Sequence, residues 1–469
     1  MSKISNVRLP NAATQGYSPE QFNQLVRSLE QIVLQLNTTY SPVATEDKDS
    51  AYAWYGDGGG FMDTAGLTIP VSIGGTNTDA FGRLRVSEPY TLFDSQNRYA
   101  ADNQFDASTT GTGSTTFLSN EAAVKMEVTG AGVGSVTRQS YRSFPYQPGK
   151  GLLVLATFVM DSSTSANLTQ QVGYYNASNG VFFKRTGSTL SFVLRTSTTG
   201  SPSDARFANQ ADWNGDKLNG TGASGLTLDL TKPQILWMDF EWLGVGSVRC
   251  GFIINGQYIV CHTFNTANVY GSSVYMTTAT LPVRYEIVTT TSAVAASMKS
   301  ICCTVISEGG FEQTSIDHVA RRTTVLGTIG STFLPIVSIR LASTALGAVV
   351  LPNRVQVLPT TSQNYEVALI KNPTLTAASW AAVPTDANVQ YDVSATATTG
   401  GSIVQTDYVT ASGSAGVSNT SLPSAYNFDL QLGASIAGVS DIYTVAIRTV
   451  SGATTGDAVG SLSFYDLTQ

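Results

Sequence analysis

The stretch QILWMDFEWLGVGSVRCGFIINGQYIVCHTF, residues 234–264, decides the fold class. It contains three runs of apolar and β-branched residues separated by short turns, a pattern typical of consecutive antiparallel strands. The second turn is Asn255-Gly256, a pair that favours the type I′ turn of a two-residue hairpin. Counting outward from this turn places one set of apolar residues on a single face, as expected for the core side of a sandwich. The set is Val248, Cys250, Phe252, Ile254, Ile259 and Cys261.

The same signals recur on both sides of this stretch. GLLVLATFVM, residues 151–160, predicts a buried strand, and residues 181–197 predict a hairpin that turns at Gly187-Ser188. Many strands with turn residues about every ten positions, and without intervening helices, favour antiparallel double sheets. We therefore predict a mainly β protein with a β-sandwich at residues 81–310.

After Gly309-Gly310 the composition shifts toward Ala, Thr, Val and Ser. Further strands are predicted at residues 333–343, 354–359, 365–373 and 441–450. They indicate a second, smaller β-sandwich at residues 311–469. Its first residues, FEQTSIDHVARRTT (311–324), are expected to form a short helical connector.

One helix-periodic segment, YSPEQFNQLVRSLEQIVLQLN (17–37), precedes the β region. Ser18 suits the N-cap and Pro19 the first helical position. Apolar residues at spacings of three and four give the helix one broad stripe: Phe22, Leu25, Val26, Leu29, Ile32, Val33 and Leu36. The stripe either packs on the chain's own β-domain or is covered by another chain. A long Gly-rich neck at 41–80 favours the second interpretation, so residues 1–40 are expected to be an assembly anchor, as in a trimeric bundle.

Composition excludes several classes of function. Of the 469 residues only 13% are charged, and the net charge is −7 with no cluster of Lys and Arg, which argues against nucleic-acid binding. No apolar run approaches the roughly 20 residues that a membrane span needs, and the N-terminus lacks the apolar core of a signal peptide. We expect no membrane attachment and synthesis in a cytoplasm. Such a weakly charged surface favours coverage by copies of the chain or by other subunits.

The four cysteines fit a reducing compartment. In the predicted hairpin Cys250 faces Cys261 at a distance that would permit a disulfide, and His262 faces Arg249. Buried free thiols are favoured over a bridge because nothing in the chain implies export.

The most enzyme-like pair is Asp239 and Glu241, which share one side of a strand, as acid/base glycoside chemistry requires. Sandwich glycosidases of the lectin-like kind carry a third carboxylate at the same alternation, and Trp242, Leu243 and Gly244 follow here instead. We favour a structural role, with Asp239 paired to Arg284 or another basic neighbour.

No metal or other cofactor is predicted. The turn from Asp212 to Asp216 gathers oxygen ligands but lacks the calcium-loop pattern, so an Asx-turn is favoured. His262 and His318, the only histidines, lack zinc spacing. Trp213 and Trp242 are the candidates for stacking on a glycan, with core packing as the alternative.

Three stretches carry a resemblance to a known group of proteins. Residues 4–37, ISNVRLPNAATQGYSPEQFNQLVRSLEQIVLQLN, resemble the N-terminal module of virion proteins from tailed bacteriophages, particularly those of marine cyanobacteria. Residues 81–99, FGRLRVSEPYTLFDSQNRY, and residues 213–264 are similar to phage structural proteins with a concanavalin-like sandwich. The resemblance covers residues 1 to about 310 and implies a tail fibre, baseplate or head-surface component. It places no catalytic or binding residue on this chain.

These observations predict a non-enzymatic phage virion structural protein, assembled in the host cytoplasm and located in the virion. The helix would anchor a homotrimer to other virion proteins, and the β-domains would be displayed for contact with a host surface glycan. Two alternatives stay open. One is a glycan-cleaving tailspike that uses Asp239 and Glu241, and the other is a pure carbohydrate-binding adhesin.

Overall fold

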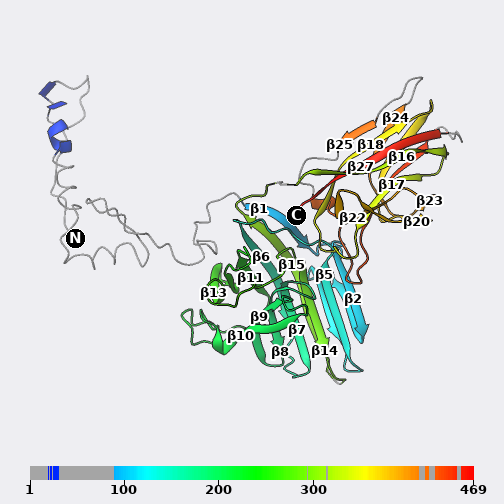
Figure 1. Ribbon diagram of the computed structural model, residues 1–469. Coiled ribbons are helices and arrows are strands. Elements are labelled where there is room, and N and C mark those ends of the chain that lie inside the picture. Colours follow the sequence, from blue (N-terminus) through cyan, green and yellow to red (C-terminus); the bar gives the residue numbers. More distant parts are fainter. Residues whose placement is uncertain are drawn as a thin grey trace. The chain divides into compact units, whose positions relative to one another are not determined.

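A computed structural model shows a mainly β chain, as predicted, in which the strand pairings are antiparallel. The chain divides into two units, residues 1–78 and residues 79–469, and Figure 1 colours them along the sequence. The residues that the structure describes are 19–20, 22–23, 25–30, 89–292, 294–312, 315–410, 418–421, 428–450 and 456–468.

The first β-sandwich consists of two large sheets, drawn in cyan to green in Figure 1. The eight-stranded sheet contains β13 (Gln257–Phe264), β12 (Val248–Ile254), β11 (Gln234–Phe240), β6 (Gly151–Met160), β15 (Ala296–Glu308), β4 (Ala123–Val128) and β3 (Gly113–Leu118) in this order, with β1 (Pro89–Gln96) paired to β15. The seven-stranded sheet runs β10 (Ser203–Asn209), β9 (Thr189–Thr196), β8 (Gly180–Thr186), β7 (Leu168–Tyr175), β14 (Val283–Thr289), β5 (Gly134–Ser140) and β2 (Phe105–Gly111).

Aromatic rings from the two sheets meet in one core. The ring of Phe183 on β8 lies 6.0 Å from that of Phe158 on β6 and 5.3 Å from that of Phe252 on β12, centroid to centroid. Each strand contributes alternate residues to this core, because successive side chains of a strand point to opposite faces. The predicted strand at 151–160 and the hairpin around Gly187-Ser188 are confirmed.

The three strands predicted in residues 234–264 are confirmed as β11, β12 and β13. Asn255 and Gly256 have φ values of 52° and 76°, as a type I′ turn requires. The register differs from the prediction because β13 carries a bulge: Cys250 pairs with His262, and Cys261 is the extra residue. The expected pairings of Cys250 with Cys261 and of His262 with Arg249 are therefore wrong.

The thiols are free, as favoured from the sequence. Cys250, Cys261 and Cys303 are buried, and Cys302 is half-buried. Burial raises the pKa of the Cys250 thiol well above its ordinary value, so the thiol stays protonated at neutral pH.

The second sandwich, yellow to red in Figure 1, has its own core. Its four-stranded sheet contains β16 (Asp317–Ile329), β27 (Gly456–Asp466), β18 (Val350–Pro359) and β25 (Ser418–Ser421) in this order. Its six-stranded sheet runs β21 (Ala381–Val383), β22 (Asp386–Asp392), β17 (Leu334–Leu341), β26 (Ile442–Thr449), β19 (Asn364–Lys371) and β24 (Ser402–Thr410), and β20 (Thr374–Thr376) pairs separately with β23 (Ala397–Thr399). The two sheets approach closely at Gly460 of β27, where an added Cβ would lie 3.0 Å from Ile336 of β17.

The helical connector expected at 311–324 is wrong. Residues 317–324 belong to the thirteen-residue strand β16, which pairs with β27. His318 and Ala320 are buried while Asp317 and Val319 are exposed, so the segment has the period of two of a strand. Partners supplied by β27, at the far end of the chain, override the local preference.

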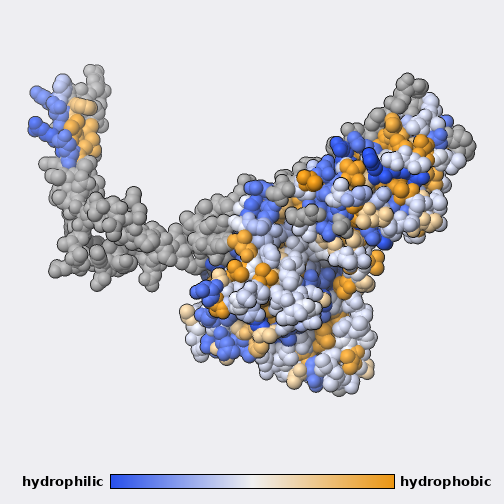
Figure 2. Space-filling view, viewed as in Figure 1, coloured by the Kyte–Doolittle hydropathy of each residue, from blue (hydrophilic) through white to orange (hydrophobic). Residues whose placement is uncertain are grey.

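The described residues of the N-terminal unit between 19 and 30 are helical, within the predicted helix. Phe22, Val26 and Leu29 are 57%, 37% and 49% exposed, and Leu25 is half-buried. Figure 2 shows a hydrophilic and a hydrophobic side on this segment. The predicted stripe residues Ile32, Val33 and Leu36 and the predicted neck at 41–80 lie outside the described residues. No helix in the described part of the chain is long and apolar enough to cross a membrane.

Candidate functional site

The outer face of the seven-stranded sheet carries an unusual group of side chains. On β7, Val172 and Tyr174 point into the core, so the alternation of a strand turns Gln171 and Tyr175 to the outer face. Partners from neighbouring strands surround these two residues. We call the group the outer-face cluster: Gln171, Tyr175, Phe182, Lys184, Arg195, Asp204, Arg284 and Glu286.

Two aromatic rings form the floor of the cluster. Tyr175 and Phe182 lie 4.4 Å apart, centroid to centroid, and both are fully buried although they face away from the core. Guanidinium groups shelter them: Arg195 lies 4.9 Å above the Phe182 ring, and Arg284 lies 5.4 Å from the centre of the Tyr175 ring. Burial raises the pKa of Tyr175 well above its ordinary value, so its hydroxyl remains protonated.

The charges of the cluster are arranged in two groups. Arg195 donates two hydrogen bonds to Asp204, of 2.7 and 3.0 Å, and Lys184 lies 3.9 Å from the same carboxylate. Arg284 donates a 2.9 Å hydrogen bond to Glu286. Each guanidinium therefore already has a carboxylate partner, and the geometry of the Arg195 pair is the bidentate form favoured for arginine.

Gln171 and Arg284 are the members of the cluster whose hydrogen bonding is incomplete. Gln171 is only 7% exposed, and its side-chain oxygen Oε1 has no hydrogen-bond partner among the described residues. It pairs in register with Glu286 on one side and Lys184 on the other, so its amide stands between them. Nε of Arg284 is likewise buried and has no partner in the described part of the chain. Buried polar atoms without partners are rare in folded proteins.

The outer-face cluster therefore holds a buried acceptor and a buried donor on strands that also carry two enclosed rings. Because arginine side chains cover the rings, the cluster forms a small second core on the outer face of the sheet. This cluster was not predicted from the sequence. A signal was present in the doublets Tyr174-Tyr175 and Phe182-Phe183, because a strand must turn one ring of each doublet away from the core.

Asp239 and Glu241, the pair that the glycosidase alternative would use, are fully buried. Arg249 of β12 donates hydrogen bonds to Oδ2 of Asp239 through Nε, at 3.1 Å, and through Nη2. The predicted pairing of Asp239 with a basic neighbour is therefore confirmed, although the partner is Arg249 and Arg284 belongs to the outer-face cluster. A polysaccharide chain has no direct access to carboxylates that are fully enclosed.

The predicted glycan-stacking residue Trp213 belongs to the core. Its ring is 2% exposed and lies 4.9 Å from that of Phe192, so neither face is open to a sugar. The predicted stacking role of Trp213 is therefore wrong. Trp213 lies in the loop that follows η2 (Gln210–Asp212), and the N–H groups of Gly215 and Asp216 hold this loop against carbonyl oxygens of β13. The side chain of Asp216 accepts a hydrogen bond from the N–H group of Leu218, two residues on, as in the favoured Asx-turn, and a second from the N–H group of Ser224.

Trp242, the second predicted stacking residue, is half-buried. Its ring nitrogen donates a 3.2 Å bond to the carbonyl oxygen of Met276, and the ring meets Tyr146 edge-on. Trp242 is not part of the outer-face cluster. Within the described residues no group of three or more His, Cys, Asp or Glu side chains is placed to hold a metal ion.

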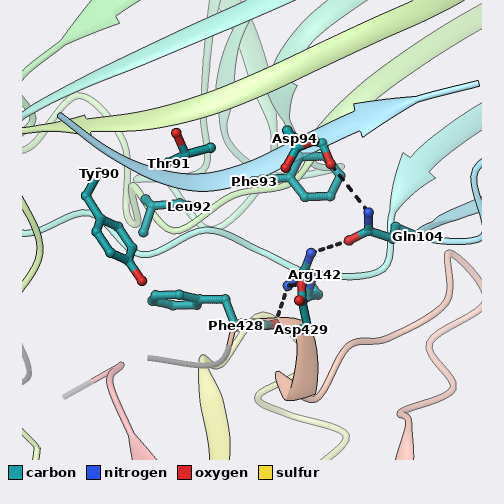
Figure 3. Close-up of a pocket in the computed structure, with 9 residues that line it drawn as sticks. All are labelled: Tyr90, Thr91, Leu92, Phe93, Asp94, Gln104, Arg142, Phe428 and Asp429. Atoms are coloured by element: carbon teal, nitrogen blue, oxygen red, sulfur yellow. Dashed lines mark hydrogen bonds and ion pairs between the residues drawn. The ribbon is translucent and has the colours of Figure 1, made fainter. Parts of the chain in front are cut away.

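A hollow of about 250 Å³ lies between β1 and η3 (Phe428–Leu430), as Figure 3 shows. Arg142 reaches across it, donating to the carbonyl oxygen of Phe428 and to the side chain of Gln104. Its guanidinium also lies 3.7 Å from Asp429 and 5.3 Å above the ring of Phe93. The guanidinium thus bonds residues of both sandwiches, and the hollow lies at their junction.

The fold and the site define a mainly β protein of antiparallel sandwiches with a polar and aromatic cluster on one sheet face. No family model matches the sequence, and no curated protein matches it. Solved structures show distant similarity. A protein of unknown function from Shewanella oneidensis MR-1 is 8% identical, with a TM-score of 0.32, and the match covers 49% of this chain and 91% of that one.

Lectin-like domains are among the other similar structures. A legume lectin-like domain from Entamoeba histolytica is 10% identical, with a TM-score of 0.28, over 45% of this chain and 96% of that chain. A carbohydrate esterase from the Shiga toxin-encoding bacteriophage phi24B is 10% identical, with a TM-score of 0.28, over 47% of this chain and 99% of that chain. No ligand or activity is carried over from these proteins.

Proposed function

We propose that this chain is a non-enzymatic structural protein of a phage virion, anchored through its N-terminal helix as a homotrimer and displaying its two sandwiches. The observation that carries the proposal is the exposure of apolar residues on the helix, in a unit separate from the β body. Phe22 and Leu29 are about half exposed. An apolar helix stripe in water is stabilised when another chain covers it.

Two further observations support the proposal. Residues 4–37 resemble the N-terminal module of virion proteins from tailed phages. The charged fraction is low, and Figure 2 shows the first sandwich with mostly pale, near-neutral residues on the face in view. A surface of this kind suits close packing among other subunits.

The oligomeric state of the full-length chain tests the anchor. Light scattering should give about three times the chain mass of 49.5 kDa. Leu29→Asp places a charge in the apolar stripe and should produce monomers, whereas Asn23→Asp, at an exposed polar position, should leave the trimer intact. A monomeric wild type, or a Leu29→Asp variant that stays trimeric, would overturn the proposed trimer.

Incorporation into particles tests the virion assignment. Cells infected by a phage that encodes Leu29→Asp in place of the natural residue should yield particles that lack this chain, as measured by mass spectrometry of purified virions. The Asn23→Asp chain should be retained. If purified virions never contain the wild-type chain, the assignment is wrong.

We infer the absence of glycosidase activity from the enclosure of Asp239 and Glu241. The full-length chain should release no reducing ends from host surface polysaccharide. Robust release that disappears in Glu241→Gln would overturn this inference and establish the tailspike alternative.

The adhesin alternative assigns a purely carbohydrate-binding role to the displayed sandwiches. Binding to a glycan and a place in the virion are compatible, because many weak contacts gain strength from the copy number of a displayed protein.

A further inference from the structure

We propose that the loop at residues 97–102 docks on a second copy of this chain, with the ring of Tyr99 entering the hollow between β1 and η3 of that copy. The loop follows β1 and precedes β2. The proposal rests on the proposed function for the presence of a second copy in the assembly. It adds a contact between the displayed β bodies, which the helical anchor by itself does not provide.

Tyr99 lies at the exposed tip of this loop. It is 96% exposed, more than any other large hydrophobic side chain among the described residues. Its neighbours Arg98 and Ala100 are exposed as well. A single exposed aromatic residue needs no explanation. Tyrosine and arginine side by side, however, are two of the residue types that most often dominate the binding energy of protein interfaces.

The base of the loop is held rigidly. Asn97 is 4% exposed, and its Nδ2 donates a 2.8 Å hydrogen bond to the carbonyl oxygen of Ile301 on β15. Its Oδ1 accepts hydrogen bonds from the N–H group of Asp102, at 3.0 Å, and from Arg138, at 3.1 Å. Because these bonds fix both ends of the loop, docking of Tyr99 orders little additional backbone.

The hollow has the size and the lining that an aromatic ring needs. Its volume is about 250 Å³, and a cavity of about 150 Å³ is enough to hold benzene. Figure 3 shows the rings of Tyr90 and Phe428 on one side, with centroids 6.1 Å apart in an edge-on arrangement. On the other side Asp94 offers carboxylate oxygens to the hydroxyl group of an incoming tyrosine. Asp94 and Asp429 are exposed, so the hollow is open to solvent.

The charges of the loop and of the hollow are complementary. Two carboxylates, Asp94 and Asp429, line the hollow together with the single guanidinium of Arg142. Arg142 is buried and lies 3.7 Å from Asp429, so its charge compensates one of the two carboxylates. The excess negative charge, exposed at Asp94, matches the positive charge of Arg98 beside Tyr99. One loop of a second copy therefore brings both a ring for the aromatic wall and a cation for the carboxylate.

The symmetry of this contact agrees with the proposed homotrimer. Loop and hollow are different surfaces, so each copy inserts its loop into the hollow of the next, and such heterologous contacts can close into a ring. Copies held together by their helices meet at an effective concentration of about millimolar order, so a weak contact forms within the trimer. Leu29→Asp is still expected to yield monomers, because separated chains lack this concentration.

Photochemical cross-linking in the full-length protein tests the contact. Tyr99 is replaced by p-azidophenylalanine, which keeps a phenyl ring of similar size and is linked by ultraviolet light to the residues around it. We expect covalent dimers and trimers in which peptide mass spectrometry places the linkage at β1 or η3 of the other chain. The control carries the same replacement at Tyr408, which is 68% exposed on β24, and should give no linkage to these peptides above background.

A charge exchange tests the complementarity. In the cross-linking chain, Asp94→Lys should lower the yield about tenfold, because Arg98 then meets a like charge. Adding Arg98→Glu should restore most of the yield, since the two charges are then exchanged. The matched control Asp212→Lys, at an exposed carboxylate that does not line the hollow, should leave the yield unchanged.

Light scattering of the same samples separates this contact from the helical anchor. If the trimer forms and irradiation gives no linkage to β1 or η3, the contact is overturned and the anchor stands. If the chain is monomeric, the anchor is overturned; linkage on irradiation at about 1 mM chain then supports the contact, and its absence overturns it. The proposal is also overturned if Asp94→Lys leaves the yield unchanged, or if Arg98→Glu fails to restore it.

Discussion

The guanidinium of Arg142 donates a hydrogen bond to the carbonyl oxygen of Phe428, a residue that follows 286 positions later in the chain. The bond joins the first sandwich to η3 of the second, at the hollow drawn in Figure 3. Arg142 is buried, and the desolvation lowers the pKa of its guanidinium, while nearby carboxylates favour the charged form. We expect a buried cation that contacts both sandwiches to couple their stabilities.

We predict that Arg142→Met lowers the free energy of unfolding by about 2–4 kcal/mol, because the carbonyl oxygen of Phe428 and the side chain of Gln104 both lose their donor. Calorimetry should resolve two transitions in the variant where the wild type shows one. Asp429→Asn is the control: Asp429 is exposed, so the change should cost less than about 1 kcal/mol. A single transition at the wild-type temperature in Arg142→Met would contradict the coupling.

A pair of carboxyl groups predicts pH-dependent stability in the second sandwich. Asp386 on β22 and Asp466 on β27 belong to different sheets, yet both bind Asn388, through its backbone N–H at 2.8 Å and its side-chain amide at 2.7 Å. Burial, and to a smaller extent the charge of Asp466, raises the pKa of Asp386, against opposing effects of the Asn388 N–H and of His318. The folded state therefore holds this proton more tightly than the unfolded state.

The sign follows from that difference. Stability due to the raised pKa is fully present below the ordinary Asp value of 3.8 and is lost as the pH rises through the folded-state pKa. We predict that Asp386→Asn gains stability relative to the wild type as the pH rises above about 4, measured by urea unfolding at each pH. The exposed control Asp212→Asn should show no such trend. A difference between variant and wild type that stays constant with pH would refute the prediction.

Gly251 of β12 marks a close approach within the eight-stranded sheet. A Cβ atom there would lie 1.8 Å from the carbonyl oxygen of Ile259 and 2.8 Å from Nε1 of Trp237. We predict that Gly251→Ala destabilises the protein by about 3 kcal/mol, measured by chemical denaturation, because the contact involves backbone that cannot move freely. Gly330→Ala, where nothing lies within 4 Å, should change stability little. Equal effects of the two changes would show that the site relaxes without cost.

Local patterns were sufficient to predict the strands of residues 234–264. The alternation of apolar residues and the Asn255-Gly256 turn are both short-range features of the sequence. The bulge at Cys261 was not predicted, and its backbone bonds to residues outside the hairpin. The extra residue turns the carbonyl oxygens of Val260 and Cys261 toward the N–H groups of Asp216 and Gly215. The sequence of the hairpin alone does not reveal this loop as a partner, so the register predicted from the turn lacks the bulge.

In the outer-face cluster, too, one part was predictable from the sequence and another was not. That Tyr175 and Phe182 face outward follows from alternation along β7 and β8. That they are nonetheless buried depends on Arg195 and Arg284, which come from strands β9 and β14. The predicted role of Trp213 in stacking on a glycan is wrong for a related reason, because backbone bonds to β13 hold the loop that buries it. Sequence reasoning identified the strands, whereas the neighbours of each side chain required the tertiary structure.

The tilted pair of Tyr175 and Phe182 has a thermodynamic consequence. Because two arginines exclude water from both rings, these rings are apolar surface that is buried on folding although they face away from the core. Burial of apolar surface on folding raises the heat capacity of unfolding. The outer face of this sheet therefore adds to that heat capacity, as a second thin apolar layer does.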